Sequence, residues 1–234
     1  MHSNSITLVL LIPILLLAGC TATTQNGAEP VQGRVVFAIT DAAADLGAVS
    51  SIDVTIDRVE VHNDAEGWVT VSDTPKTYDL LELRDENGTV ALADVMLDAG
   101  TYQQIRMEIS DVTVTDAEGE EEAKLPSGEL RLVGNVVVEE NITSAVTFDF
   151  IANESLHTTG NGRYIFAPVI QLETRTDADV AVAADYNRVR IRGGTVTTAT
   201  RLGMDVDGNV GAGLTIPAEA RVDIGADGRV VIGV

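Results

Sequence analysis

The sequence predicts an all-β protein whose folded body is an antiparallel β-sandwich. Along most of the 234 residues, apolar side chains alternate with polar ones, or short β-branched runs stand between turn residues. A period of two is typical of strands with one buried and one solvated face. About nine such segments follow at intervals of roughly 8–12 residues, which indicates a sandwich rather than a parallel sheet. No helical period competes with this pattern.

The first apolar segment, residues 6–19, is predicted to belong to a signal peptide. Its 14 residues are too few for a membrane helix, which needs about 20, but they match the apolar region of a secretory signal. The segment ends in Leu17-Ala18-Gly19-Cys20, which resembles a prokaryotic lipobox, where the cysteine thiol receives a diacylglyceryl group. We therefore expect residues 1–19 to be removed and Cys20 to anchor the chain. The alternative is a free cysteine inside an apolar helix.

Residues 20–32 are predicted to form a lipidated tether. They are small and polar, and they include glycine and proline, which is the composition of a flexible linker. Two acyl chains on Cys20 give stable membrane attachment where one chain is marginal. The chain is thus expected to be exported and held at the outer face of a prokaryotic membrane.

Strands of the body are expected in order from the alternation. In the second of them Ile52, Val54 and Ile56 point to one face, with the intervening polar residues pointing to the other. Asn87-Gly88 and Ser127-Gly128 supply turns. Trp68, the single tryptophan, is expected to cap the core, with a ligand contact as the alternative. The expected strands are residues 34–39, 52–61, 68–71, 77–83, 89–96, 102–115, 129–138, 142–150 and 164–173.

A change in charge marks a boundary near residues 174–180. Residues 1–174 hold 28 of the 36 acids and 8 of the 15 bases, whereas residues 175–234 are nearly neutral. We therefore divide the body into a sandwich, residues 33–174, and an extension, residues 175–234. Three turns in the extension, at Gly193-Gly194, Asp207-Gly208 and Asp227-Gly228, predict consecutive β-hairpins.

Three arginines alternate with apolar residues at the start of this extension. In Arg188-Val189-Arg190-Ile191-Arg192 the guanidinium groups fall on one face of a strand. One hypothesis is that this face docks on an acidic surface, such as the acidic sandwich. The other is that it is a solvated face that protects a sheet edge.

A series of segments along the body carries a family resemblance. The segments are GRVVFAITD (33–41), VTIDRVEVHNDAEGW (54–68), YDLLEL (78–83), AGTYQQIRMEI (99–109), LPSGELRL (125–132), VTFDF (146–150) and APVIQ (167–171). Together they resemble the DUF4382 family of prokaryotic exported proteins, whose function is unassigned. The resemblance covers residues 32–173 and implies no catalytic residues. The turn at residues 99–102 also resembles one that begins a strand in prealbumin-like sandwiches, so an Ig-like or prealbumin-like sandwich is expected.

The net charge of −21 argues against nucleic acid as a partner and raises the hypothesis of a halophilic source. Nucleic acid is not an expected partner, because the chain offers little to neutralise phosphates. Lys76 and Lys124 are the only lysines. An acid-rich, lysine-poor surface stays hydrated at high salt, so a halophilic source is one hypothesis. Ordinary acidity that confers solubility is the other.

No catalytic site is predicted, and calcium is the metal that the sequence favours. His62 and His157 are far apart in sequence, with no second cysteine or His-x-x-x-His pair to complete a zinc site. Asp205, Asp207 and Asn209 place three oxygen side chains at alternate positions, like the start of a calcium loop. A simple Asp-Gly hairpin turn is the alternative. The acidic run at residues 118–122 is interpreted as a solvated loop.

Three sequons offer glycosylation sites, at Asn87, Asn141 and Asn153. None has proline in its middle position.

The sequence indicates a lipid-anchored cell-envelope protein with a non-enzymatic role in binding or assembly. Its partner would be an envelope protein or a polysaccharide. The alternatives are a hydrolase that acts on envelope polymers and a calcium-dependent carbohydrate-binding module. An aromatic content of 4% leaves few rings for stacking on sugars, which weakens the last alternative.

Replacing the anchor residue tests this interpretation. Cys20→Ala removes the thiol that would carry the lipid, so the protein should no longer partition into the detergent phase of a Triton X-114 extraction. Unchanged partitioning would contradict lipid attachment.

Overall fold

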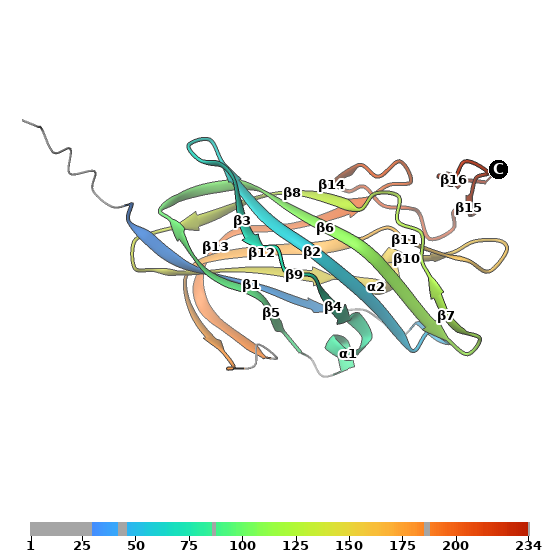
Figure 1. Ribbon diagram of the computed structural model, residues 1–234, viewed down its shortest axis with the longest axis horizontal. Helices are drawn as coiled ribbons and strands as arrows, with labels where there is room; N and C mark the ends of the chain where they lie inside the picture. The colour runs from blue at the N-terminus through green and yellow to red at the C-terminus, as the bar shows by residue number, and fades with distance from the viewer. Residues whose placement is uncertain (1–29, 42–45, 86–87, 185–187, 234) are drawn as a thin grey trace, which may run out of the picture.

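The computed structural model describes residues 30–41, 46–85, 88–184 and 188–233 and has the predicted all-β architecture (Figure 1). Two six-stranded sheets face each other across a common core. Sheet A has the order β14 (Val210–Ala212), β13 (Val189–Met204), β12 (Val169–Val182), β9 (Thr143–Phe150), β1 (Gln32–Asp41), β5 (Val90–Asp98).

Sheet B is built on the long central pair β2 (Ser51–Asn63) and β6 (Gly100–Asp116). Strands β3 (Gly67–Ser72) and β4 (Lys76–Asp79) pair successively with β2, and β7 (Gly119–Glu122) and β8 (Glu129–Val138) pair with β6. Two small hairpins and two short helices complete the described fold: β10 (Leu156–Thr158) with β11 (Tyr164–Phe166), β15 (Val222–Ile224) with β16 (Val230–Ile232), α1 (Leu80–Asp85) and α2 (Ala152–Ser155).

The main core lies between the two sheets, where alternate side chains of each strand meet. From sheet A, Phe37 and Phe148 are fully buried, and their rings stack with centroids 6.5 Å apart. From sheet B, Tyr102, Ile105 and Met107 are equally buried. The alternation along β2, β6 and β8, which bulges interrupt in β2 and β6, is thus explained by one face against the core and one in solvent.

Strand β1 differs from this pattern because both of its faces are buried. Val35 and Phe37 face the main core, and Val36 and Ala38 belong to a second apolar cluster on the outer face of sheet A. This strand also pairs in parallel with β9, the single parallel pair between strands in the described part of the chain. Parallel strands are usually covered on both faces, as β1 is.

The second cluster forms because the long β12–β13 hairpin folds over sheet A. Val189 is buried against Val36, Ala38 and Ala91, with half-buried apolar neighbours on the same hairpin. The backbone N–H of Val189 donates to the carbonyl of Thr89 at 2.6 Å. Strand β12 runs without a break through residues 174–180, so the hairpin continues a strand of the sandwich.

The hypothesis that the arginine face of this hairpin docks on the sandwich is wrong. Arg188, Arg190 and Arg192 are exposed, whereas Val189 between them is 6% exposed. The apolar face docks because burying Val189 is favourable, while burying guanidinium groups without partners is costly.

Four expected elements differ from the observed ones. The turn expected at Gly193-Gly194 lies inside β13, where both glycines have positive φ, and the strands of this hairpin instead end at Val182 and begin at Val189. The strand expected at residues 77–83 ends at Asp79, whose Oδ1 accepts from the N–H of Leu81 at 2.9 Å and begins α1. The strand expected at 164–173 is interrupted at Pro168, which has no N–H to donate to a ladder. The acidic run expected in a loop instead forms β7, which pairs with the end of β6.

In the described part of the chain, no helix has the length and apolar character needed to cross a bilayer.

The docked hairpin gives a test with a matched control. Val189→Asp places a carboxylate in the second cluster, and we expect it to lower the free energy of unfolding by about 2 kcal/mol or more and to expose the hairpin to proteases. Arg190→Asp, one residue along on the exposed face, should do neither. Equal protease sensitivity of the two variants would contradict the docking.

Candidate functional site: the open flank of the sandwich

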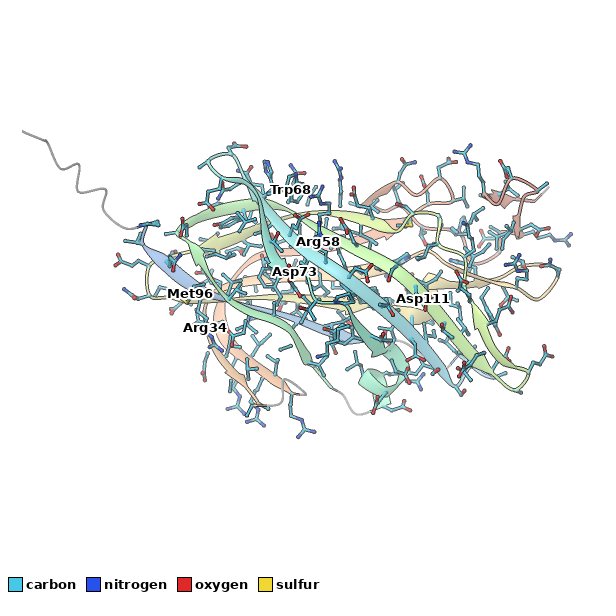
Figure 2. The ribbon with its side chains drawn as sticks, in the orientation of Figure 1. Arg34, Arg58, Trp68, Asp73, Met96 and Asp111 are labelled. Carbon is cyan, nitrogen blue, oxygen red and sulfur yellow. The ribbon has the colours of Figure 1, made fainter. Side chains whose placement is uncertain are left out.

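A groove of about 550 Å³ opens along one side of the sandwich, between the edges of the two sheets. We call it the open flank. One wall comes from sheet B, where β3 passes into β4, and includes Val71 and Tyr78. The other wall is residues 91–95 of β5 in sheet A. In Figure 2 Asp73 marks the first wall and Met96 the strand end beyond the second. Four of its lining residues, Ile56, Val71, Tyr78 and Ala93, belong to the main core.

The backbone of β5 is paired on one side only. Its described strand partner is β1, and no described backbone group bonds its other edge between residues 91 and 98. The N–H of Ala99 donates to the carbonyl of Val31 at 2.8 Å, so Val31 and Ala99 are a hydrogen-bonded pair at the end of the β1–β5 ladder. Since such pairs alternate along an antiparallel ladder, the N–H and C=O groups of Asp94 and Met96 point away from β1. The open flank thus combines apolar side chains with an exposed row of backbone donors and acceptors.

One cation at the rim of the groove has no carboxylate partner among the described residues. The Nζ of Lys76 lies 5.0 Å from the ring centroid of Tyr78, and it forms no ion pair in the described structure. Burial raises the pKa of Tyr78 to about 12, so its hydroxyl stays protonated at neutral pH. In contrast, Arg34 holds the nearby carboxylate of Asp94 through two hydrogen bonds of 2.8 Å. An anionic group on a ligand would therefore meet Lys76.

A second cluster lies on the outer face of sheet B, at Trp68. The expectation that Trp68 caps the core is wrong, because its ring lies on the outer face against His62 and Arg106. The guanidinium carbon of Arg106 is 4.3 Å from the ring centroid. Arg106 also forms an ion pair with Glu60, which is buried, and approaches Glu129 at 4.0 Å. This network links the edge strand β3 to β2, which pairs with it, and to β6 on the far side of β2.

The other half of that outer face is acidic. Burial and the neighbouring charge of Asp79 raise the pKa of Asp53; the hydrogen bond from Ser51 opposes this, and Glu120 and Asp111 add to it. These carboxylates come from four different strands, so no local sequence motif predicts that they lie together. Within the described residues, no group of acids, histidines and cysteines is arranged to hold a metal ion.

The predicted calcium residues lie together in the turn between β13 and β14. Asp205 Oδ1 accepts from the backbone N–H groups of Asp207 at 3.0 Å and Asn209 at 2.9 Å. The side-chain nitrogen of Asn209 donates to both oxygens of Asp205. Burial raises the pKa of Asp205, but these hydrogen bonds outweigh it and hold the pKa below its usual value. Hydrogen bonds alone account for this turn, and calcium binding stays a prediction.

The remaining predicted residues do not converge on a site. Asn141 is exposed in the turn before β9, with a positive φ of 58°, and Asn153 is exposed in α2. Asn87 and Cys20 lie outside the described residues. His62 is on β2, whereas His157 is on β10, so the two histidines belong to different sheets.

His157 lines a separate pocket of about 440 Å³ together with residues 215–218. Its Nε2 is buried without a hydrogen-bond partner in the described structure. Burial lowers the pKa of His157, so the ring is neutral at neutral pH. The lining residues with a hydroxyl group are Thr158 and Thr215. Neither hydroxyl forms a described hydrogen bond with His157, so the pocket shows no nucleophile paired with a base.

Sequence reasoning missed the open flank because its two walls come from strands that do not pair. Residues 71–78 and 91–95 each show an ordinary strand or turn pattern. Strand β5 carries two acids, Asp94 and Asp98, so its sequence gives no local sign of an available edge.

Comparison with known proteins assigns the sandwich to a family and nothing further. A family model described as a domain of unknown function (DUF4382) matches residues 32–168. No curated protein and no solved structure matches the chain.

The Trp68 cluster gives a stability test. Arg106→Met leaves the buried Glu60 carboxylate without its partner, which should lower the free energy of unfolding by about 2 kcal/mol and change the Trp68 fluorescence. Arg131→Met, which removes an exposed arginine from the same face, should cost less than about 0.5 kcal/mol. Chemical denaturation measures both. Equal losses would show that the Glu60 pair does not support this face.

Proposed function

We propose a function for this chain, which belongs to the DUF4382 family of unknown function: it is a lipid-anchored protein of the cell envelope with a non-enzymatic role in binding or assembly. Cys20 would carry the lipid, and residues 21–32 would hold the sandwich away from the membrane. The partner would be another envelope protein, bound at the open flank.

The observation that carries this proposal is the chemistry of the open flank. Its lining is mainly apolar, with Ile56, Val71 and Tyr78 on one wall and Ala91 and Ala93 on the other. An apolar groove beside an unpaired strand edge suits the binding of a polypeptide, which offers both apolar side chains and backbone hydrogen bonds.

The same chemistry favours binding over hydrolysis. Cleavage of an envelope polymer by paired carboxylates requires two acids a few ångströms apart across the scissile bond. Two acids line the open flank, Asp73 in the loop between β3 and β4 and Asp94 on β5. The carboxylate of Asp94 is held in an ion pair by Arg34, so the two acids do not form a free catalytic pair. A hydrolase would therefore need a different surface of the molecule.

A carbohydrate-binding role draws on one separate observation, the half-buried Trp68 on the outer face of sheet B. Aromatic rings in such positions can stack on sugars. The ring of Trp68 is already in contact with His62 and Arg106, however. These contacts give Trp68 a structural role without any ligand, so we place the partner at the open flank.

Photocrosslinking in living cells tests the proposal. A photoreactive amino acid would replace Thr74 in one variant and Leu92 in another, because these residues lie on opposite walls of the groove. Both variants should crosslink to the same envelope protein. Val133, which is exposed on β8, is the matched control and should not yield that product.

Two outcomes would overturn the proposal. One is crosslinking only within the protein itself from both walls, which would leave a stand-alone receptor or an enzyme. The other is an equal yield of the same product from the Val133 control, which would place the partner elsewhere.

A further inference from the structure

We infer that the open flank binds its partner by strand addition, in which an extended peptide segment pairs with the free edge of β5. This inference rests on the proposed function and specifies the ligand class at the same site. The segment would extend sheet A by one strand and turn alternate apolar side chains into the groove. It would also carry an acidic side chain for Lys76.

In the described structure the backbone of β5 has free hydrogen-bonding groups along its outer edge. The N–H and C=O groups of Asp94 and Met96 point away from β1, because Val31 and Ala99 form a hydrogen-bonded pair in the same ladder. They are free to pair with a further strand. An incoming strand satisfies these groups without any rearrangement of β1. Pairing along residues 90–98 takes a segment of about nine residues, since a strand advances roughly 3.3 Å per residue.

Three other sheet edges are less suited to pairing than that of β5. The edge strand β7 carries three consecutive glutamates, Glu120–Glu122, and charged side chains hinder edge pairing. The edge strand β14 has only three residues. Strand β8 is partly covered by sheet A, because the N–H and C=O of Asn135 bond the hydroxyls of Thr198 and Thr197.

Strand β5 lacks each of these protections along its central part. The carboxylate of Asp94 is held by Arg34, and that of Asp98 accepts a hydrogen bond from Gln32. Met96 is 54% exposed, an apolar side chain on an edge strand. An edge of this kind either promotes aggregation or binds a partner strand. A net charge of −21 opposes pairing between copies of this chain, so a different polypeptide fits better.

The groove offers apolar surface to the side chains of an incoming strand. Ala93, on the core side of β5, has a short side chain, and the groove beside it is lined by the core residues Val71 and Tyr78, which keep 7% and 5% of their surface exposed. In a strand paired with β5, every second side chain would point to this side. Small or β-branched apolar residues at those positions would pack against the core between the sheets.

Lys76 supplies the charge preference. It is one of two lysines in the chain and lies at the groove rim without a carboxylate partner among the described residues. A glutamate or aspartate in the incoming segment would pair with it. The preferred ligand is therefore an extended, β-prone peptide with alternating apolar side chains and one acidic residue.

A proline substitution on the edge of β5 tests strand addition. Met96→Pro removes an N–H that points away from β1, so the strand should still pair with β1, as proline is tolerated on sheet edges. The matched control is Met96→Ala, which keeps the N–H and removes the side chain. The probe is a library of synthetic nonapeptides, selected on the full-length protein in detergent micelles.

We expect selection of peptides with alternating apolar residues and an acidic one. Their affinity should fall about tenfold or more in Met96→Pro, as for loss of backbone hydrogen bonds, and less than about threefold in Met96→Ala. Lys76→Glu should weaken the same peptides. In the unsubstituted protein, peptide binding should also slow hydrogen exchange of the Asp94 and Met96 amides, which does not depend on the proline variant folding.

The outcomes separate this inference from the proposed function. If selected peptides bind equally to Met96→Pro and leave exchange of both amides unchanged, strand addition is wrong. Crosslinks from Thr74 and Leu92 to one envelope protein would then still support binding at the open flank by another mode. If no peptide is selected and no such crosslinks form, both proposals fail.

Discussion

Strand β1 is buried on both faces, and the positions of the β12–β13 hairpin and of the free sheet edge follow from this burial. One face contributes Phe37 to the main core, which any two-layer sandwich would cover. The opposite face carries Val36 and Ala38, which would be exposed if sheet A were a solvated outer layer. The chain covers them by extending β12 and β13 beyond the sheet and folding the hairpin back. Arg34 joins these parts, with hydrogen bonds to Asp94 of β5 and to the carbonyl of Val180 of β12.

This arrangement also determines which edges of the molecule are available. The hairpin protects the outer face of sheet A and the first residue before β5, through the bond from Val189 to Thr89. The rest of β5 stays at the edge, facing the point where β3 passes into β4. The loop at residues 73–75 carries the chain from one strand to the next along β2, and it leaves core side chains accessible between the sheets. The candidate site therefore forms where the edge of sheet A at β5 faces the edge of sheet B at β3 and β4.

Sequence patterns predicted most strands correctly where one physical preference acted alone. Alternation identified the second, sixth and eighth strands, since each has one buried and one solvated face. Patterns failed where a single residue changed the local preference, as Asp79 did by accepting the N–H of Leu81 and Pro168 by lacking an N–H. Trp68 was misplaced because a large aromatic residue usually indicates a core, and the stabilising contact with Arg106 comes from a strand some forty residues away in sequence.

Residue patterns along the chain were enough to predict that it is all-β, that its body belongs to one family, and that residues 189 and 191 lie opposite the neighbouring arginines. These properties depend on neighbours along the chain or on side-chain periodicity. Residue patterns could not predict which face of the hairpin is buried, which strand edge stays unpaired, or which residues line the groove beside it. Those outcomes depend on contacts between segments such as 71–78 and 91–95, whose proximity follows from strand order and not from any local pattern.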